Sequence, residues 1–304
     1  MQTQIPPRAG MKTEFFTLCP LCQGREFSLR YDLSNLKVFQ CRACSLVFLN
    51  PYNPPSEMSA FYQNHEARVQ ANSRLASYYS YLGGSRTEKF FDETLVRLKP
   101  YLSGDRAALL DIACGNGHFL SRAKQKGWEV RGLDSSAENS RSAWENHQIT
   151  VAVSDFGDYQ TSERFDCVSL WDFIEHVPDP RALLAKAGSF LKPSGVLLVA
   201  TPDHFSLINF LADLIHLLSF GLIKKPLQVL FVPEHVLYFT DRTLKKMLEE
   251  NGLEIISVIK TGTDIDRYQT SPLFNWTAKI LLFMSALFHW QNRIVVFARK
   301  RNSN

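Results

Sequence analysis

From residue 106 onward, short apolar segments alternate with amphipathic helical segments, and this alternation restricts the fold more than any other feature of the sequence. The segments expected to be strands are 107–112, 129–133, 150–153, 167–171 and 196–200. Strands separated by helices need crossover connections, so we predict a doubly wound, mostly parallel α/β sheet. Two later strands, 253–260 and 293–299, have no crossover helix pattern between them and are expected to form an antiparallel pair at the sheet edge.

A glycine-rich turn follows the first predicted strand. Asp111 ends that strand, Gly115 and Gly117 occupy the turn, and a helix is expected over 118–126. Glycine lets the backbone pass close to a ligand, and the free N–H groups at a helix N-terminus attract an anion. A glycine turn alone is weak support for a binding site, because packing can also require one.

Acidic residues end the next two predicted strands. Asp134 ends the second, where a carboxylate can accept hydrogen bonds from both hydroxyls of a ribose. Asp155 and Phe156 follow the third, and an acceptor beside an aromatic ring suits adenine. Because ligands of such sheets bind outside the carboxyl ends of the strands, we expect these groups to converge on one crevice.

Together these motifs resemble the class I S-adenosylmethionine-dependent methyltransferases, over residues 75 to 300. The D-x-G-x-G-x-G loop of that family corresponds to residues 111–117, and its small-molecule branch has segments similar to 170–180, 191–197 and 233–240. The resemblance implies S-adenosylmethionine as cofactor, a Rossmann-like fold and a set of cofactor-binding residues. These are Asp111, Ala113, Gly115, Gly117, Asp134, Ser135, Asp155, Phe156 and Trp171.

Ala113 departs from the family pattern, because it replaces the first glycine of the loop. We expect a negative φ there, a conformation that alanine tolerates, and hence altered packing with cofactor binding retained. A nicotinamide dinucleotide is disfavoured, since Leu120 stands where its G-x-G-x-x-G fingerprint needs the third glycine.

Two histidines are candidates for the base that removes a proton from the methyl acceptor. His176 follows the fourth strand, His235 lies in the segment that covers the acceptor side in related enzymes, and Glu175 could orient either ring. The ordinary pKa of histidine suits a base at neutral pH. The alternative for His176 is a hydrogen bond that holds the loop carrying Trp171 and Asp172, with no catalytic part.

Two C-x-x-C pairs near the N-terminus match the spacing of a four-thiolate zinc site. The expected ligands are Cys19, Cys22, Cys41 and Cys44, and a hairpin over 27–31 and 37–40 between the pairs completes a zinc ribbon. A closed four-sulfur site is structural, and a thioredoxin-like redox role is disfavoured because no βαβ unit surrounds either pair. Contact with nucleic acid is the alternative role. Cys114 and Cys167 are interpreted as core residues.

The overall charge argues against a nucleic-acid partner. Lys and Arg number 34 against 30 Asp and Glu, a net charge of +4, which is small for a protein that neutralises many phosphates. Arg8, Lys12 and Glu14 interrupt any apolar leader segment, so we expect a cytoplasmic protein with reduced thiols.

Two apolar insertions flank His235. Residues 205–223 contain no Lys or Arg, and 280–290 form a second apolar run. Asp213 argues against a membrane span, at about 2.5–3.5 kcal/mol for an acid at a helix centre. Two alternatives stay open: helices packed on the domain as a lid, or a membrane-surface platform that admits a lipid-linked acceptor.

The chain is therefore divided into a flexible tail (1–14), a zinc ribbon (15–50), a helical linker and lid (51–105) and a catalytic domain (106–304) with insertions near 205–230 and 270–290. The predicted function is methyl transfer to oxygen or nitrogen of a small molecule, a sugar or a lipid-linked glycan. The alternatives are an RNA-guanine methyltransferase and an adaptor that binds the cofactor without turnover. The sequence does not identify the acceptor.

Overall fold

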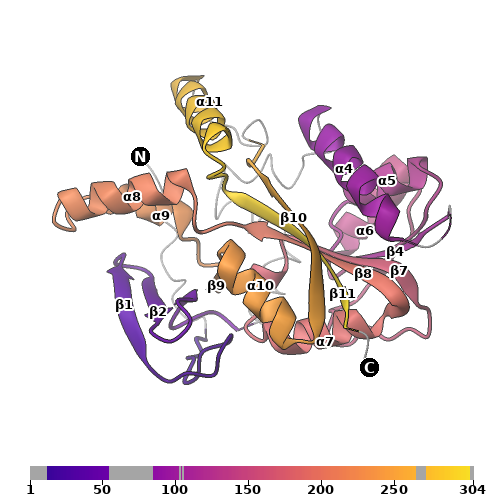
Figure 1. Ribbon diagram of the computed structural model, residues 1–304, viewed down its shortest axis with the longest axis horizontal. Coiled ribbons are helices and arrows are strands. Elements are labelled where there is room, and N and C mark those ends of the chain that lie inside the picture. The colour runs from indigo at the N-terminus through magenta and orange to yellow at the C-terminus, as the bar shows by residue number, and fades with distance from the viewer. Residues whose placement is uncertain (1–11, 55–84, 103, 105, 265–271, 302–304) are drawn as a thin grey trace.

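A seven-stranded sheet organises most of the chain in the computed structural model (Figure 1), which describes residues 12–54, 85–102, 104, 106–264 and 272–301. The strand order is β10-β11-β8-β7-β4-β5-β6. The strands are β4 (Ala108–Ile112), β5 (Glu129–Asp134), β6 (Val151–Val153), β7 (Phe165–Trp171), β8 (Leu191–Pro202), β10 (Leu253–Thr261) and β11 (Arg293–Lys300). Strands β4 to β8 pair in parallel, while β10 and β11 are antiparallel at one edge. The predicted sheet and its edge pair are confirmed.

Helices cover both faces of this sheet, as the doubly wound prediction requires. The helices are α4 (Ser85–Leu98), α5 (His118–Gln125), α6 (Ala137–His147), α7 (Pro180–Ser189), α8 (Leu207–Leu218), α9 (Lys225–Leu230), α10 (Asp241–Glu250) and α11 (Pro272–Leu287), with short 3-10 turns η1 (Lys99–Tyr101) and η2 (Ile174–His176). Successive strand residues enter different cores: Leu109 packs in the cluster beneath α4 and α5, and Leu110 in the cluster beneath α7 and α10. The alternation follows from the two-residue side-chain period of a strand.

The cysteine-rich segment forms a second, four-stranded sheet of order β1-β2-β3-β9. The predicted hairpin is present as β1 (Phe27–Asp32) and β2 (Lys37–Cys41). Two further strands, β3 (Val47–Leu49) and β9 (Leu237–Tyr238), were not predicted. Strand β9 comes from the catalytic part of the chain, almost two hundred residues after β3. The ribbon thus shares a sheet with the domain that follows it.

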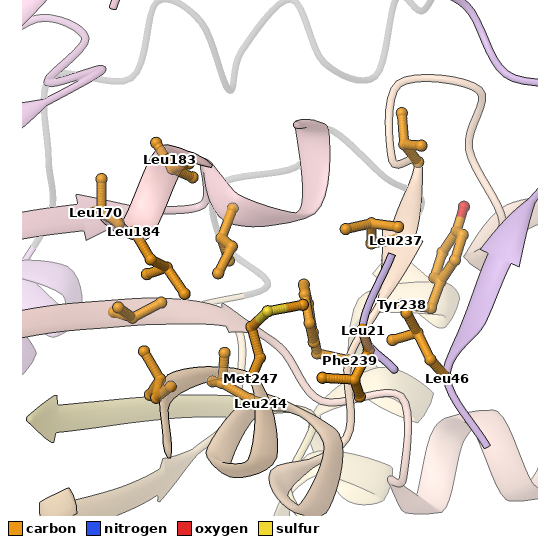
Figure 2. Packing of buried hydrophobic residues seen from close by; sticks show 14 of the residues in the cluster. Leu21, Leu46, Leu170, Leu183, Leu184, Leu237, Tyr238, Phe239, Leu244 and Met247 are labelled. Carbon is orange, nitrogen blue, oxygen red and sulfur yellow. The ribbon is translucent and has the colours of Figure 1, made fainter. Parts of the chain in front are cut away.

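Side chains of the ribbon are also continuous with the core of the larger unit. Leu21 and Leu46 are fully buried against the segment that contains Leu237 and Phe239, as Figure 2 shows. Polar contacts reinforce this packing: the Arg181 guanidinium donates to the carbonyl oxygen of Leu21, and Gln228 donates to that of Leu33. The expected ribbon is therefore built into the protein.

Part of the predicted organisation lies outside the described residues. The start of the tail and residues 55–84 of the predicted helical linker and lid belong to this part. Within the described ranges, no helix combines the length and the apolarity that crossing a bilayer requires.

Candidate active site

A cavity of about 540 Å³ opens at the carboxyl edge of the parallel strands. Its floor comes from the loop after β4 and the end of β7, and its sides come from α4, α11 and the segment after β10. The lining includes Arg86, Phe90, Phe91, Asp111, Ala113, Cys114, Gly115, Trp171, Asp172, Lys279, Phe283 and Arg293. Four predicted cofactor residues (Asp111, Ala113, Gly115 and Trp171) thus meet in one cavity.

The glycine turn has the shape of a cradle. Gly115 has a φ of 56°, and a Cβ added to it would meet no heavy atom within 4 Å. Because Gly115 lines the cavity, the space that a side chain would take belongs to the cavity. Gly117 has a φ of 76°, and an added Cβ would lie 3.1 Å from the Cβ of Ala143 on α6. The first glycine leaves room for a ligand, and the second allows α5 and α6 to pack closely.

Ala113 has a φ of 57°, so the expected negative φ is wrong. The loop keeps the left-handed conformation that a glycine would adopt freely, and the alanine side chain occupies it at a steric cost. Ala113 still lines the cavity, as the resemblance implied.

Asp134 holds the glycine turn in place through its carboxylate. Its Oδ2 accepts a hydrogen bond from the Gly115 backbone N–H at 2.8 Å. Its Oδ1 accepts from the Ser136 backbone N–H at 2.9 Å and from the Asn139 side-chain amide at 3.0 Å. The carboxyl is buried, so these bonds form in a low-dielectric setting. This supporting role was missing from the sequence analysis, where only the ribose contact was predicted.

Asp111 lies beneath the same turn and is almost completely buried. The Ser169 hydroxyl donates to its Oδ1 at 2.6 Å. Burial raises the pKa of Asp111 to about 7, and the nearby Asp134 charge acts in the same direction. A carboxyl with this pKa can bind a cationic group of a ligand, because the added positive charge favours its ionised form.

The remaining predicted cofactor residues lie beside the turn, outside the residues that line the cavity. The Ser154 backbone N–H donates to the Asp134 carbonyl oxygen at 3.1 Å, which brings Asp155 to the neighbouring strand end. Phe156 packs against the rings of Phe173 and Phe190. Ser135 follows Asp134 and is half-buried. Their contact with adenosine stays a prediction.

Aromatic and charged groups form the wall opposite the turn. The Trp171 ring lies 5.1 Å from that of Phe91 and 5.9 Å from that of Phe90 on α4. Arg293, at the start of β11, lies 5.8 Å from the Trp171 ring centre and 2.6 Å from Asp172 Oδ1. Asp172 itself has a φ of 49°, and strained backbone of this kind concentrates at functional sites.

Phe90, Phe91 and Arg293 were missed in the sequence because they belong to no motif. Arg293 reaches the cavity only because β11 runs antiparallel beside β8, which places its first residue opposite Pro202 at the carboxyl edge. The antiparallel edge pair was predicted, and the position of Arg293 in the cavity wall follows from that pairing. Helix α11, which contains most of the second apolar insertion, contributes Lys279, Leu282 and Phe283 to the lining.

The three predicted catalytic residues lie together, although none of them lines the cavity. The His176 and His235 rings are 4.7 Å apart, and His176 Nδ1 donates to the Glu234 carbonyl oxygen at 2.8 Å. Burial lowers the pKa of both histidines, so both rings are neutral at pH 7. Burial raises the pKa of Glu175 to about 8, with Asp172 adding to the effect. The role of a base stays a prediction for either histidine.

The four N-terminal cysteines converge as their spacing predicted. Cys19 and Cys44 have their Sγ atoms 3.5 Å apart, as do Cys22 and Cys41, and all four Sγ atoms lie within 4.8 Å of one another. No disulfide links them. Sulfurs around one tetrahedral zinc ion at ordinary bond lengths are about 3.8 Å apart. The cluster therefore has the size and chemistry of a zinc site.

The other two cysteines, both interpreted as core residues, differ in their surroundings. Cys167 is fully buried in β7, as expected. Cys114 is half-buried and lines the cavity, which the sequence analysis did not predict. Burial raises the pKa of both thiols well above the ordinary value, so neither is a ready nucleophile.

Comparison with known proteins decides the family. Residues 84–258, more than half of the chain, match the family described as "Methyltransferase domain". The chain belongs to this family. The resemblance to the class I S-adenosylmethionine-dependent methyltransferases is thereby confirmed, and the four-cysteine cluster precedes the matched residues of this methyltransferase.

Relatives and solved structures agree with this assignment. The methyltransferase is 32% identical over 104 residues to a protein named ubiquinone biosynthesis O-methyltransferase from Actinobacillus pleuropneumoniae, which covers 31% of this chain and 44% of the relative. It is 36% identical over 105 residues to the protein of that name from Rhodopseudomonas palustris, covering 33% and 41%. The match thus spans less than half the length of these curated relatives.

A solved structure shows the same fold. One chain of the complex between the Haloferax volcanii Trm112 methyltransferase activator and a methyltransferase superposes with a TM-score of 0.52 at 13% identity. The superposition covers 76% of this methyltransferase and 98% of that chain. At this identity the likeness concerns the fold alone.

Proposed function

We propose that this protein transfers a methyl group from S-adenosylmethionine to a hydroxyl group of a small molecule. The observation that carries the proposal is the glycine turn, where Gly115 leaves open space in a cavity that Asp111 and Trp171 also line. Family membership supports the choice of cofactor.

The residues around the turn fit the chemical groups of this cofactor. The N–H groups at the start of α5 suit its carboxylate, and Asp111 suits a cationic group. Asp134, which keeps the turn in position, also lies where the resemblance places the ribose. When bound, S-adenosylmethionine supplies a methyl group on a positively charged sulfur. The role of the protein is to position that methyl group in a cavity shielded from water.

The acceptor is proposed from the cavity wall and from the relatives. Phe90, Phe91 and Phe283 offer an apolar surface, and the relatives are named as O-methyltransferases of ubiquinone biosynthesis. A small molecule with an apolar body and a hydroxyl group suits both observations. Transfer to nitrogen, and transfer to a sugar or a lipid-linked glycan, were also expected from the sequence and are the alternatives to this acceptor.

A hydroxyl acceptor must lose its proton as the new bond to carbon forms. The neutral rings of His176 and His235 carry a lone pair for a proton, although burial lowers the pKa of both rings, and His176 follows Asp172 by four residues in the chain. Asp172 lines the cavity, whereas Glu175 and the two histidines do not. We propose that the proton passes to this group of residues.

We propose structural zinc at the four-cysteine cluster. A closed set of four thiolates leaves no position for catalysis, and small ribbons take folding free energy from the metal. Reduced thiols agree with the cytoplasmic location expected from the sequence.

Calorimetric titration with S-adenosylmethionine tests the proposed function, and the variant Gly115→Leu should abolish the binding by filling the cavity. Gly127→Leu is its matched control, because Gly127 also has a positive φ and open space around an added Cβ but lies away from the cavity. Binding to the Gly127→Leu protein but not to the Gly115→Leu protein is expected. Absence of binding to the folded, unaltered protein would overturn the proposal. Transfer of an isotope-labelled methyl group to small apolar molecules that carry a hydroxyl group then tests the reaction.

A further inference from the structure

An exposed apolar face extends over α8, the turn that follows it (219–223) and α11. Both helices project away from the main sheet in Figure 1. We call this surface the apolar face and define it by its exposed side chains. They are Phe205, Phe210, Ile215, Leu217, Leu218, Phe220, Leu222, Ile223, Trp276, Ile280, Phe283, Leu287 and Phe288. Exposed apolar surface of this extent marks a site of interaction.

The turn after α8 is built to expose two of these side chains. Gly221 N–H donates to the His216 carbonyl oxygen and Phe220 N–H to that of Leu217, which is the pattern that ends a helix with a left-handed residue. Phe220 occupies the left-handed position with a φ of 51°, where glycine is usual. Phe220 is 95% exposed and Leu222 is 85% exposed. The turn is thus hydrogen-bonded and ordered, and it presents bulky apolar groups at a conformational cost that no internal packing offsets.

The charges near the turn are of one sign. Lys224 and Lys225 follow it directly, and Lys279 is exposed on α11. Residues 205–231 and 276–290 contain one acidic residue, Asp213. Asp213 is directed toward the ribbon, where it accepts hydrogen bonds from Arg30 at 2.8 Å and from the Tyr31 hydroxyl at 2.5 Å. In these two ranges the face is therefore apolar and basic.

The apolar face borders the cavity. Strand β8 leads into α8 and α11 leads into β11, and the two helices meet where Trp290 contacts the rings of Phe205 and Phe210. On α11, Phe283 is both exposed and part of the cavity lining. A molecule held at the apolar face would thus lie beside the entrance to the proposed active site.

We propose that the apolar face docks on an anionic lipid membrane, with Phe220 and Leu222 inserted among the lipids and Lys224 and Lys225 at the headgroups. Apolar side chains beside lysines bind such surfaces by burial and by charge attraction together. A second copy of the chain is a poorer occupant, because a symmetric contact would bring lysines toward lysines with no acidic partner on the face. Docking does not depend on the reaction. Delivery of an amphiphilic acceptor to the cavity rests on the proposed function.

Sedimentation with vesicles tests the docking on the full-length protein. Binding is expected to mixed phosphatidylcholine–phosphatidylglycerol vesicles, with much weaker binding to phosphatidylcholine alone and a decrease at high salt. The double variant Phe220→Gly/Leu222→Ser should lose at least about ten-fold in affinity. Lys224→Glu/Lys225→Glu should lose more than about thirty-fold, the factor that corresponds to about 1 kcal/mol for each lysine near an anionic surface. Trp144→Ser is the control, because Trp144 is 53% exposed on α6, away from the apolar face.

Two measurements keep the test independent of folding and of the reaction. Phe220→Gly removes an unfavourable backbone conformation, so its Tm should equal or exceed that of the unaltered chain while vesicle binding falls. Cofactor titration of the same preparations shows whether the proposed active site is intact. Equal binding to neutral and anionic vesicles, no binding, or unchanged binding of both double variants would overturn the docking. A dimer in sedimentation velocity that the same variants dissociate would assign the face to a second copy, and would also overturn it.

Discussion

Replacement of Asp134 tests whether the carboxylate supports the glycine turn as well as the cofactor. In Asp134→Ala, the backbone N–H groups of Gly115 and Ser136 both lose a buried charged acceptor. A hydrogen bond to a charged group contributes about 1.5–3 kcal/mol, so two of them predict a loss of at least about 3 kcal/mol in the free energy of unfolding. At about 2–4 °C per kcal/mol for a chain of this size class, Tm should fall by roughly 6–12 °C.

Thermal unfolding and calorimetric titration with S-adenosylhomocysteine measure the two effects separately. Asp155→Ala is the matched comparison, because Asp155 is an exposed acid at the neighbouring strand end. The Tm of Asp155→Ala should stay within about 1 °C of that of the unaltered protein, since exposed substitutions change stability little. The variant should lose only affinity for the cofactor. If Asp134→Ala loses cofactor affinity with no change in Tm, the supporting role is refuted. If neither quantity changes, the cofactor binds in a different crevice.

Four further predictions concern the loop, the buried acids, the metal and the histidines. Ala113→Gly should raise the free energy of unfolding by about 0.5–1 kcal/mol in denaturant titrations, because the φ of 57° suits glycine. The pKa of Asp111 is about 7 in the folded protein and 3.8 in the free group, so the folded state binds the proton more tightly than the unfolded state. The free energy of unfolding should therefore fall as the pH rises from about 4 to about 7. Asp111→Asn should remove this part of the pH dependence, measured as the change in denaturant midpoint between pH 5 and pH 8. Cys19→Ser should release zinc in a metal assay and destabilise the protein by several kcal/mol, and retained stoichiometric zinc would contradict the assignment. If either histidine is the base, His176→Gln or His235→Gln should lower kcat by about a hundred-fold or more and change the pH profile. A lower Tm together with an unchanged pH profile of kcat would show that His176 and His235 have a packing role only.

The sequence sufficed for those parts of the fold that local patterns encode. The parallel strands were predictable because each is a short apolar run between amphipathic helices, and the hairpin of the ribbon follows from alternation around Ser34 and Asn35. The convergence of Asp111, Gly115 and Asp134 was predictable because the carboxyl ends of parallel strands share one edge.

What the sequence could not reveal depends on contacts between distant segments. The pairing of Phe48 with Leu237 leaves no local signature, because each strand is too short to show a period. Arg293 enters the cavity wall through the register of an antiparallel edge. The positive φ at Ala113 is imposed by the turn against the preference of alanine, so residue type pointed to the opposite conformation.

The shared sheet of the ribbon has a consequence for the order in which the chain can fold. Strand β3 is synthesised early, but its partner β9 ends at Tyr238, so most of the protein must be made before the ribbon sheet is complete. During that interval the apolar side chains that pack against β9 have no cover, and exposed strand edges of this kind favour aggregation. Early metal binding by the cysteine pairs would hold the hairpin together until residue 238 arrives. Zinc supply during translation should therefore affect the yield of folded protein more strongly than zinc supply afterwards.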